Sequence, residues 1–301
     1  MTGDGTAPMT RDPVFPRVSV VVPSYNNASF IEETMDSILA QTFEDFELVV
    51  ADHSSSDGTW DLLQRYGADP RVRLLRTEPG GGAPHNWERV TAAARGELVK
   101  LVCGDDLIYP DCLRLQVEAM DSNPSLVLVA ARRDLIDARG RLVKASRGLA
   151  GLLGRVPGRV AARHTVVAGS NIFGEPAAVL IRRKALERAG GWDGRAPYVI
   201  DEATYVNVLL HGDFLGINQA LAAFRLSSMQ WSVRLAREQS GQVIAFHHRL
   251  AADAPGLVSR TDVFRGDAMA RALALARRLA YVWLGRRLGS EPCPTRRPRR
   301  Q

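Results

Sequence analysis

The sequence predicts an α/β layered domain, with a mixed but mostly parallel sheet flanked by helices, followed by a helical C-terminal extension. Two observations indicate this class. In the first half of the chain, short apolar runs alternate with segments whose apolar residues recur at helical spacing. After about residue 232 the pattern is mostly helical. With 301 residues, 46% of them hydrophobic, the chain can bury a sizeable core.

The first elements follow from short-range pattern. A buried strand is expected at 18–22, an apolar run that Pro23 ends. A helix follows, because four apolar residues recur at helical spacing: Ile31, Met35, Ile38 and Leu39. A second strand is expected at 46–52. Asp57-Gly58 then turns the chain into a helix over about 59–66.

The next elements repeat this alternation as far as residue 132. Strands are expected at 72–76, 97–102 and 126–132. A flexible turn at 79–82 precedes a helix around 87–94. Gly104 stops the strand at 97–102, and a further helix follows at about 111–122.

The middle of the chain is less regular. Residues 140–170 carry many Gly and Arg with little periodicity, so loops are expected there. A strand at 177–181 and a short helix at 183–188 follow, and a later helical face ends at His211-Gly212. Near the C-terminus, apolar residues alternate with arginines in a basic amphipathic helix. Its apolar positions are Leu273, Leu275, Leu279, Val282 and Trp283. Such a helix can pack on the body or lie on a membrane surface.

Charge and composition narrow the function classes. The net charge is +6, and nine Arg with one acid lie between residues 271 and 301. This tail suits an anionic surface, or is simply solvated. It has few aromatic residues between its charges, so no nucleic-acid binding is expected. The first sixteen residues lack the apolar segment of a secretory signal, and the longest apolar runs are too short to span a bilayer. Three cysteines suit a reducing, cytoplasmic compartment.

Polar clusters follow three of the predicted strands. Ligands of parallel α/β sheets bind beyond the carboxyl ends of the strands, so these clusters are candidate site residues. They lie at 23–27, 52–58 and 104–106. In the last of them, Asp105 and Asp106 are adjacent carboxylates that repel each other unless a positive charge is near. A Mg²⁺ or Mn²⁺ ion shared with substrate phosphates is one solution, and a turn that merely favours Asp is the other.

Three segments together resemble the family 2 glycosyltransferases of the Rossmann-like GT-A fold. They are Val18-Ser-Val-Val-Val-Pro-Ser-Tyr-Asn26, Glu47-Leu-Val-Val-Ala-Asp52 with Ser55-Ser-Asp-Gly-Thr59, and Gly96-Glu-Leu-Val-Lys-Leu-Val-Cys-Gly-Asp-Asp106. The resemblance covers about residues 17–232, which we expect to be the catalytic domain. Residues 1–16 would be a disordered leader, and 233–301 the helical extension with its Arg-rich tail.

The resemblance implies roles on the donor side. Pro23, Tyr25 and Asn26 fall where the family's first loop cradles the nucleotide. Asp52 takes the place of the carboxylate that hydrogen-bonds the base, with a UDP- or dTDP-linked sugar favoured. Asp106 would bind the metal directly, and Asp105 would contact the ribose or the metal. The family often has an acid where this chain has Cys103, and a second acid where it has His53.

The resemblance also implies an acceptor side. The segment Gly169-Ser-Asn-Ile-Phe-Gly-Glu-Pro176 and the motif Gly190-Gly-Trp-Asp193 look like the family's segment after the metal site. Asp201 falls where inverting members place the base, with Glu202 as the fallback. An Asp at this place can instead cap a helix. Arg225 resembles a residue of the flexible loop that closes over the diphosphate, although a surface arginine on a strand edge would look the same.

The expected function is therefore an inverting, metal-dependent glycosyltransferase. It would move a sugar from a nucleotide-diphosphate sugar to an acceptor hydroxyl, in cell-surface polysaccharide or glycolipid biosynthesis. The acceptor would be a glycan, a lipid-linked molecule or a small molecule. The basic tail favours the inner face of the membrane. The alternative is a catalytically weak scaffold that binds nucleotide sugars or glycans on the same fold.

Overall fold

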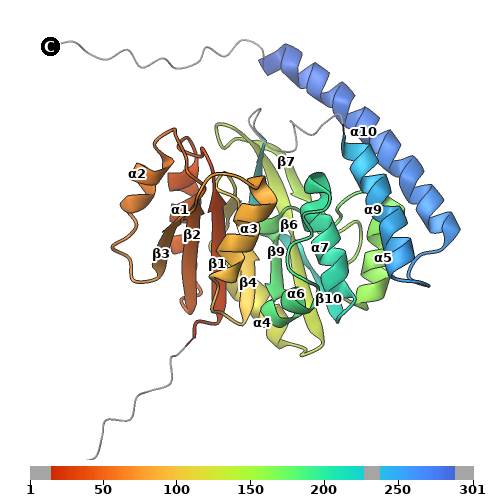
Figure 1. Cartoon of the computed structure of the whole chain (residues 1–301), viewed down its shortest axis with the longest axis horizontal. Helices are drawn as coiled ribbons and strands as arrows, with labels where there is room; N and C mark the ends of the chain where they lie inside the picture. The colour runs from red at the N-terminus through yellow and green to blue at the C-terminus, as the bar shows by residue number, and fades with distance from the viewer. Residues whose placement is uncertain (1–14, 227–237, 289–301) are drawn as a thin grey trace, which may run out of the picture.

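The computed structural model describes residues 15–226 and 238–288, with side chains up to residue 276. In this part of the chain ten strands form one sheet in the order β3-β2-β1-β4-β9-β6-β10-β5, with β7 beside β6 and β8 beside β10 (Figure 1). The strands are β1 (Val18–Ser24), β2 (Phe46–Asp52), β3 (Val72–Arg76), β4 (Leu98–Leu101), β5 (Leu107–Ile108), β6 (Leu126–Asp137), β7 (Leu142–Arg147), β8 (Gly154–Val156), β9 (Val179–Arg182) and β10 (Asp213–Leu226).

Helices cover both faces of the sheet, as expected for an α/β layered domain. Alternate residues of β1 point into two separate cores, with Val20 and Val22 in one and Val21 in the other. The first core contains α1 (Ile31–Leu39), α2 (Thr59–Gln64) and α4 (Cys112–Asp121). The second contains α3 (Gly82–Ala92), α5 (Gly158–Ala168), α6 (Arg183–Arg188), α7 (Ile200–Leu209) and α9 (Gln239–Asp253).

The sheet is mixed but mostly parallel, which confirms the predicted class. β1 pairs in parallel with β2 and β4, β2 with β3, and β6 with β10. β9 lies antiparallel between β4 and β6. The carboxyl ends of β1, β2 and β4 therefore meet at one edge, where the polar clusters begin.

The expectation that Pro23 ends the first strand was wrong, because β1 continues to Ser24. Successive residues of β1 direct their backbone N–H and C=O groups alternately toward β4 and toward β2. The carbonyl of Val21 accepts from Val102 after β4, whereas that of Ser24 accepts from His53 after β2. Pro23 therefore faces the β4 side, where β4 has already ended at Leu101. Among the described strands none needs a backbone N–H donor at this position, so a proline is tolerated.

The expectation of loops over 140–170 was also wrong. This region contains β7, β8 and α5. The strand β7 is exposed along its whole length, so it lacks the alternation that marks a half-buried strand. The buried face of α5 is formed largely by small residues, including Ala161, Ala162 and Thr165. The long strand β10 was not predicted, although it joins the sheet between β6 and β5.

Helices follow the domain, as expected after about residue 232. α9 and α10 (Arg260–Leu288) pack against each other and α10 packs against α5, at the outer side of the molecule (Figure 1). His247 and His248 of α9 both hydrogen-bond Asp267 of α10 at 2.9 Å. Within the described residues no helix is long and apolar enough to cross a membrane. The leader to residue 14, the boundary near 232 and the side chains of Leu279, Val282 and Trp283 lie outside what the structure describes.

Candidate active site

The loops after β1 and β2 are joined by a network of hydrogen bonds. The backbone N–H of Asn26 donates to Ser55 Oγ at 2.9 Å, and Asn26 Oδ1 accepts from the Ser56 N–H at 2.9 Å. Asn26 has a φ of 52°, a left-handed conformation that asparagine tolerates better than most residues. Tyr25 is exposed, with its ring edge-on to His53 at 6.1 Å. Pro23 is buried within β1, so its side chain only supports the loop.

Asp52 is the last residue of β2 and is fully buried. Its Oδ2 accepts a hydrogen bond from the Ser55 N–H at 3.2 Å. Its Oδ1 is buried and has no hydrogen-bond partner among the described residues. Burying an acceptor without a partner is costly, which points to a donor supplied by a ligand.

Gly104 brings the loop after β4 against the loop after β1. A Cβ on Gly104 would lie 2.6 Å from Oδ1 of Asn27, closer than side chains approach. Asn86 of α3 adds a second connection at this edge, because its Nδ2 donates to the carbonyls of Ser24 at 3.4 Å and Ala51 at 3.3 Å. His85, its neighbour, is exposed. The three polar clusters therefore lie together, as predicted.

Asp106 lies in the loop between β4 and β5 and is fully buried. Its Oδ1 accepts a hydrogen bond from the backbone N–H of Arg225 at 3.1 Å, whereas Oδ2 is buried and has no partner among the described residues. Burial, together with the neighbouring charge of Asp105, raises the pKa of Asp106 well above its usual range. A cation here would favour the charged form and would satisfy Oδ2.

Cys103 directly precedes Gly104 and the Asp105-Asp106 pair, at the position where the resemblance would lead one to expect an acid. Burial and the nearby carboxylates of Asp106, Asp105, Asp201 and Glu175 raise the pKa of its thiol well above the usual range. The thiol is therefore neutral near pH 7. A neutral thiol is a poor ligand for Mg²⁺ or Mn²⁺, which prefer oxygen. The pair Asp105-Asp106 therefore remains as the acidic part of the candidate metal site.

Arg225 does not lie in a loop, contrary to expectation, because it is on β10 and fully buried. Its Nε donates to the backbone carbonyl of Asp105 at 2.9 Å. Its Nη2 pairs with Glu33 of α1 at 2.6 Å, and its guanidinium lies over the Phe30 ring at 4.7 Å. β10 pairs with β6 at Arg225 and with β5 just before it, which brings the strand beside the Asp105-Asp106 turn. In this structure the arginine holds the Asp105-Asp106 turn.

Asp201 lies in the first turn of α7, with Val199 rather than Asp201 at the helix N-cap. Its Oδ1 accepts from the Glu202 N–H at 2.7 Å, and Oδ2 from Asn171 Nδ2 at 2.8 Å. Burial, followed by the negative charge of Glu175, raises the pKa of Asp201 to about 6. A carboxylate with such a pKa is suited to act as a base near neutral pH. Glu202 is more deeply buried, at 2% exposure.

Two site residues were not singled out by sequence reasoning, Asn171 and Glu175. Both lie in the segment before η1 (Pro176–Ala178), and both act on Asp201, the first by a hydrogen bond and the second by its charge. The signal that could have found them was the turn chemistry of Asn171, Gly174 and Pro176, which indicates a tightly built loop. The motif ending in Asp193 contributes by packing. Trp192 is buried, donates to Thr91 Oγ1 at 2.8 Å and lies beside α3.

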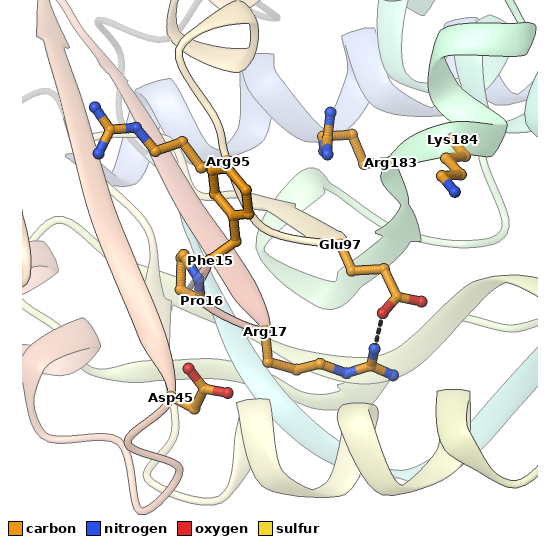
Figure 2. A pocket seen from close by; sticks show the side chains of 8 residues that line it. All are labelled: Phe15, Pro16, Arg17, Asp45, Arg95, Glu97, Arg183 and Lys184. Carbon is orange, nitrogen blue, oxygen red and sulfur yellow. Dashed lines mark hydrogen bonds and ion pairs between the residues drawn. The ribbon is translucent and has the colours of Figure 1, made fainter. Parts of the chain in front are cut away.

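A cavity of about 310 Å³ lies at the opposite end of the sheet. Arg17, Asp45 and Glu97 line it and immediately precede or flank the amino ends of β1, β2 and β4. Figure 2 shows the side chains of Arg95 and Lys184 extending in different directions rather than converging on the cavity. Glu97 is already paired with Arg17 and Arg182. This cavity is therefore a poor candidate for the functional site.

The residues present fit a divalent metal that is completed by substrate. Among the described residues no group of three or more His, Cys, Asp or Glu side chains could hold a metal ion alone. Two adjacent carboxylates are nevertheless present, and one of their oxygens is buried without a partner. Mg²⁺ and Mn²⁺ sites commonly consist of one or two carboxylates plus phosphate oxygens and water.

Comparison with known proteins gives a consistent result. The model of the family described as Glycosyl transferase family 2 matches residues 19–190. An uncharacterised protein of Mycobacterium tuberculosis is 30% identical over 239 residues, covering 77% of this chain and 74% of its own. The putative teichuronic acid biosynthesis glycosyltransferase TuaG of Bacillus subtilis is 37% identical over 106 residues, covering 35% and 42%.

Solved structures share the fold at low sequence identity. The S. aureus protein TarS (residues 1–349), in complex with UDP-GlcNAc, has a TM-score of 0.64 at 17% identity, covering 91% of this chain and 76% of that one. The mannosyltransferase PcManGT of Pyrobaculum calidifontis, in complex with GDP-Man and Mn²⁺, has a TM-score of 0.63 at 20% identity, covering 94% and 78%.

Proposed function

The chain belongs to glycosyl transferase family 2 and has the GT-A fold, and on this premise we propose that it is an inverting, metal-dependent glycosyltransferase. The donor would be a nucleotide-diphosphate sugar, with UDP or dTDP favoured, and the acceptor a hydroxyl of a cell-surface polysaccharide or glycolipid precursor. Support for the donor class comes from the neighbouring structures, which are complexes with UDP-GlcNAc and with GDP-Man. Curated relatives include polysaccharide-forming enzymes such as chondroitin synthase.

One observation carries this proposal: two buried carboxylate oxygens at one edge of the sheet have no partner among the described residues. They are Oδ1 of Asp52 and Oδ2 of Asp106. An acceptor at Asp52 suits a ring N–H of the base, such as the imide N–H of uracil or thymine; guanine also offers a ring N–H, so the nucleotide screen below decides between them. An acceptor at Asp106 suits a divalent cation. Asp52 thus fits the base of the donor, and Asp106 fits the cation that would accompany its diphosphate.

The residues divide the reaction between them. Asp52 and the loop of Tyr25 and Asn26 bind the nucleotide. Asp106, with Asp105, would hold Mg²⁺ or Mn²⁺, and such an ion offsets the charge of the leaving diphosphate when it is bound. Asp201 takes the proton of the acceptor hydroxyl as its oxygen bonds to the anomeric carbon and the bond to the diphosphate oxygen breaks. One displacement inverts the configuration.

The test compares Asp106→Ala and Asp201→Asn with wild type. Thermal shift with UDP, dTDP and GDP, with and without Mn²⁺, selects the nucleotide. Release of nucleoside diphosphate from the matching sugar donor then measures turnover. Both variants should lose metal-dependent turnover by at least about a hundredfold. Asp213→Asn, at the start of β10 beside Arg155, serves as the control. Full turnover in both variants would sink the proposal. Donor binding without turnover by wild type across acceptors would favour the binding scaffold.

The same proposal places the enzyme at the cytoplasmic face of an anionic membrane, where a lipid-linked acceptor would lie. Support comes from α10, which carries seven arginines and two aspartates in its sequence. Both aspartates face inward, at 4% and 8% exposure, with Asp262 paired to Arg163. The outward side carries exposed Phe264, Met269 and Leu275. A helix face that combines arginines with exposed apolar side chains favours anionic lipid surfaces.

Vesicle sedimentation tests this location with the full chain. Binding to vesicles containing anionic phospholipid should exceed binding to phosphatidylcholine alone, and should weaken as salt is raised. Phe264→Ser should reduce binding several-fold. Phe15→Ser, which removes an exposed aromatic side chain just before the amino end of β1, should leave vesicle binding unchanged. Equal binding to both vesicle types, or equal loss in both variants, would exclude a membrane-facing α10.

A further inference from the structure

Asn171 is the centre of a small hydrogen-bond network at the base. Its Nδ2 donates to the carbonyl of Gly174 at 2.9 Å and to Asp201 Oδ2 at 2.8 Å. Its Oδ1 accepts from the N–H groups of Phe173 at 3.0 Å and Gly174 at 3.1 Å. The two amide donors and the carbonyl acceptor are therefore all used. This side chain fixes the Asp201 carboxylate to the loop that carries Glu175.

Glu175 is held in place by Arg133 of β6. The two side chains form a bidentate pair, in which Nη2 donates to Oε1 at 3.1 Å and Nε to Oε2. Two glycines leave room for this guanidinium, since a Cβ on Gly148 or Gly174 would lie 2.6 or 3.1 Å from Nη1. Both glycines have a positive φ, of 115° and 106°. Such a bidentate pair with a buried arginine keeps the charge of Glu175 in one position.

We propose that Asn171 and Glu175 are positioning residues for the base. Asn171 aligns the Asp201 carboxylate, and Glu175, anchored by Arg133, keeps a second negative charge beside it. The inference rests on the proposed function, in which Asp201 is the base. A like charge nearby makes a carboxylate more basic, whereas a donated hydrogen bond makes it less basic. The two residues therefore act in opposite directions, and they adjust a pKa that burial has already raised.

Other titratable groups surround Asp201, and their charges contribute to its titration. Cys103 follows β4, Glu202 and Tyr205 lie on α7, Asp105 and Asp106 follow Cys103, and Arg133 lies on β6. Tyr205 and Cys103 stay neutral near pH 7, because burial raises the pKa of each well above its usual range. Glu175 is the like charge that bears most on Asp201, after burial itself.

The test is a carboxyl titration that needs no substrate. The full chain is labelled with ¹³C-carboxyl aspartate, and the Asp201 resonance is assigned by its absence from Asp201→Asn. The wild-type midpoint is expected at about 6. Glu175→Gln should lower the midpoint, because the like charge is gone. Asn171→Ala should raise it, because a donor to the charged form is gone, and Asn171→Ser provides a milder version if the alanine variant folds poorly.

Opposite shifts are the signature, since a general loosening of the site would move both variants the same way. Glu175→Asp keeps the charge and should restore a midpoint near that of wild type. An unchanged midpoint in Glu175→Gln, or shifts of the same sign in both variants, would overturn the inference. The proposed function fails separately. It fails if Asp201→Asn keeps turnover, whatever the titration shows.

Discussion

Replacing Asp201 with asparagine should stabilise the folded protein near neutral pH while it removes the proposed base. In the folded state the pKa of Asp201 is raised from 3.8 to about 6, mainly by burial. Keeping this group charged at about pH 7.5 therefore costs about 3 kcal/mol, an upper value because the side chain is partly exposed. Asparagine carries no charge. It loses one hydrogen bond, because its amide would face the Nδ2 of Asn171, at a cost of about 1 kcal/mol.

The net effect is a gain of about 2 kcal/mol at about pH 7.5, or about 4 °C in Tm for a chain of this size. The gain depends on pH in a defined sense. A raised pKa means that the folded state binds the proton more tightly, so wild-type stability falls as pH rises from about 4 to about 6. At about pH 4.5 the wild type has regained most of this stability, and the two proteins should be nearly equal.

Urea denaturation at the two pH values measures the difference, with Asp193→Asn as the matched control. Asp193 is also buried, at 8% exposure, but its ion pairs with Arg195 and Arg249 lower its pKa. That variant should be less stable than wild type at about pH 7.5, and the loss should shrink as pH falls. The reasoning fails if Asp201→Asn is no more stable than wild type at neutral pH, or if its advantage persists unchanged at about pH 4.5.

Three further predictions concern the donor side. Asp52→Asn should weaken UDP binding about tenfold in calorimetry, because an amide cannot offer the acceptor pattern of the buried carboxylate, and an unchanged Kd would contradict its role. Asp106→Ala should abolish the part of UDP binding that depends on Mn²⁺ while leaving the metal-independent part, so persistent Mn²⁺ enhancement would place the metal elsewhere. Gly104→Ala should cost about 1–3 kcal/mol in urea denaturation, because its Cβ would meet Asn27 at 2.6 Å, whereas Gly241→Ala in the open face of α9 should cost nothing.

The fold was predictable where the local pattern and the tertiary environment agree. The strand at 46–52 and the strand at 72–76 have the expected bounds, because each is a short apolar run between turn signals. The pattern failed where burial is achieved without apolar periodicity. α5 buries alanines and a threonine, which carry little hydrophobic signal. β10 alternates irregularly, with register shifts against β6 that interrupt a period of two.

The site was predictable in its positions and less so in its contacts. The carboxyl ends of parallel strands meet at one edge, so the clusters that contain Asp52 and Asp106 could be brought together from their order in the chain. Arg225 shows the limit. A motif gave its place beside the site, but only the contacts of its side chain show that the guanidinium turns inward, toward Glu33 and the Asp105 carbonyl. Sequence spacing does not encode which way a side chain leaves an unpredicted strand.

The buried position of Arg225 has a consequence for how the Asp105-Asp106 turn is maintained. An arginine that is fully buried must satisfy its donors, and here it does so on α1, on the Asp105 backbone and on the turn after β6 through Ala138. Its own backbone N–H meanwhile orients Asp106. Segments distant in sequence thus converge on Arg225, and Arg225 passes these contacts on to the two-residue turn. Because the Asp105-Asp106 turn is held by backbone contacts as well as by charge, it can keep the two carboxyl groups adjacent before any cation arrives, which is the pre-organisation that the proposed metal site, with its few protein ligands, would require.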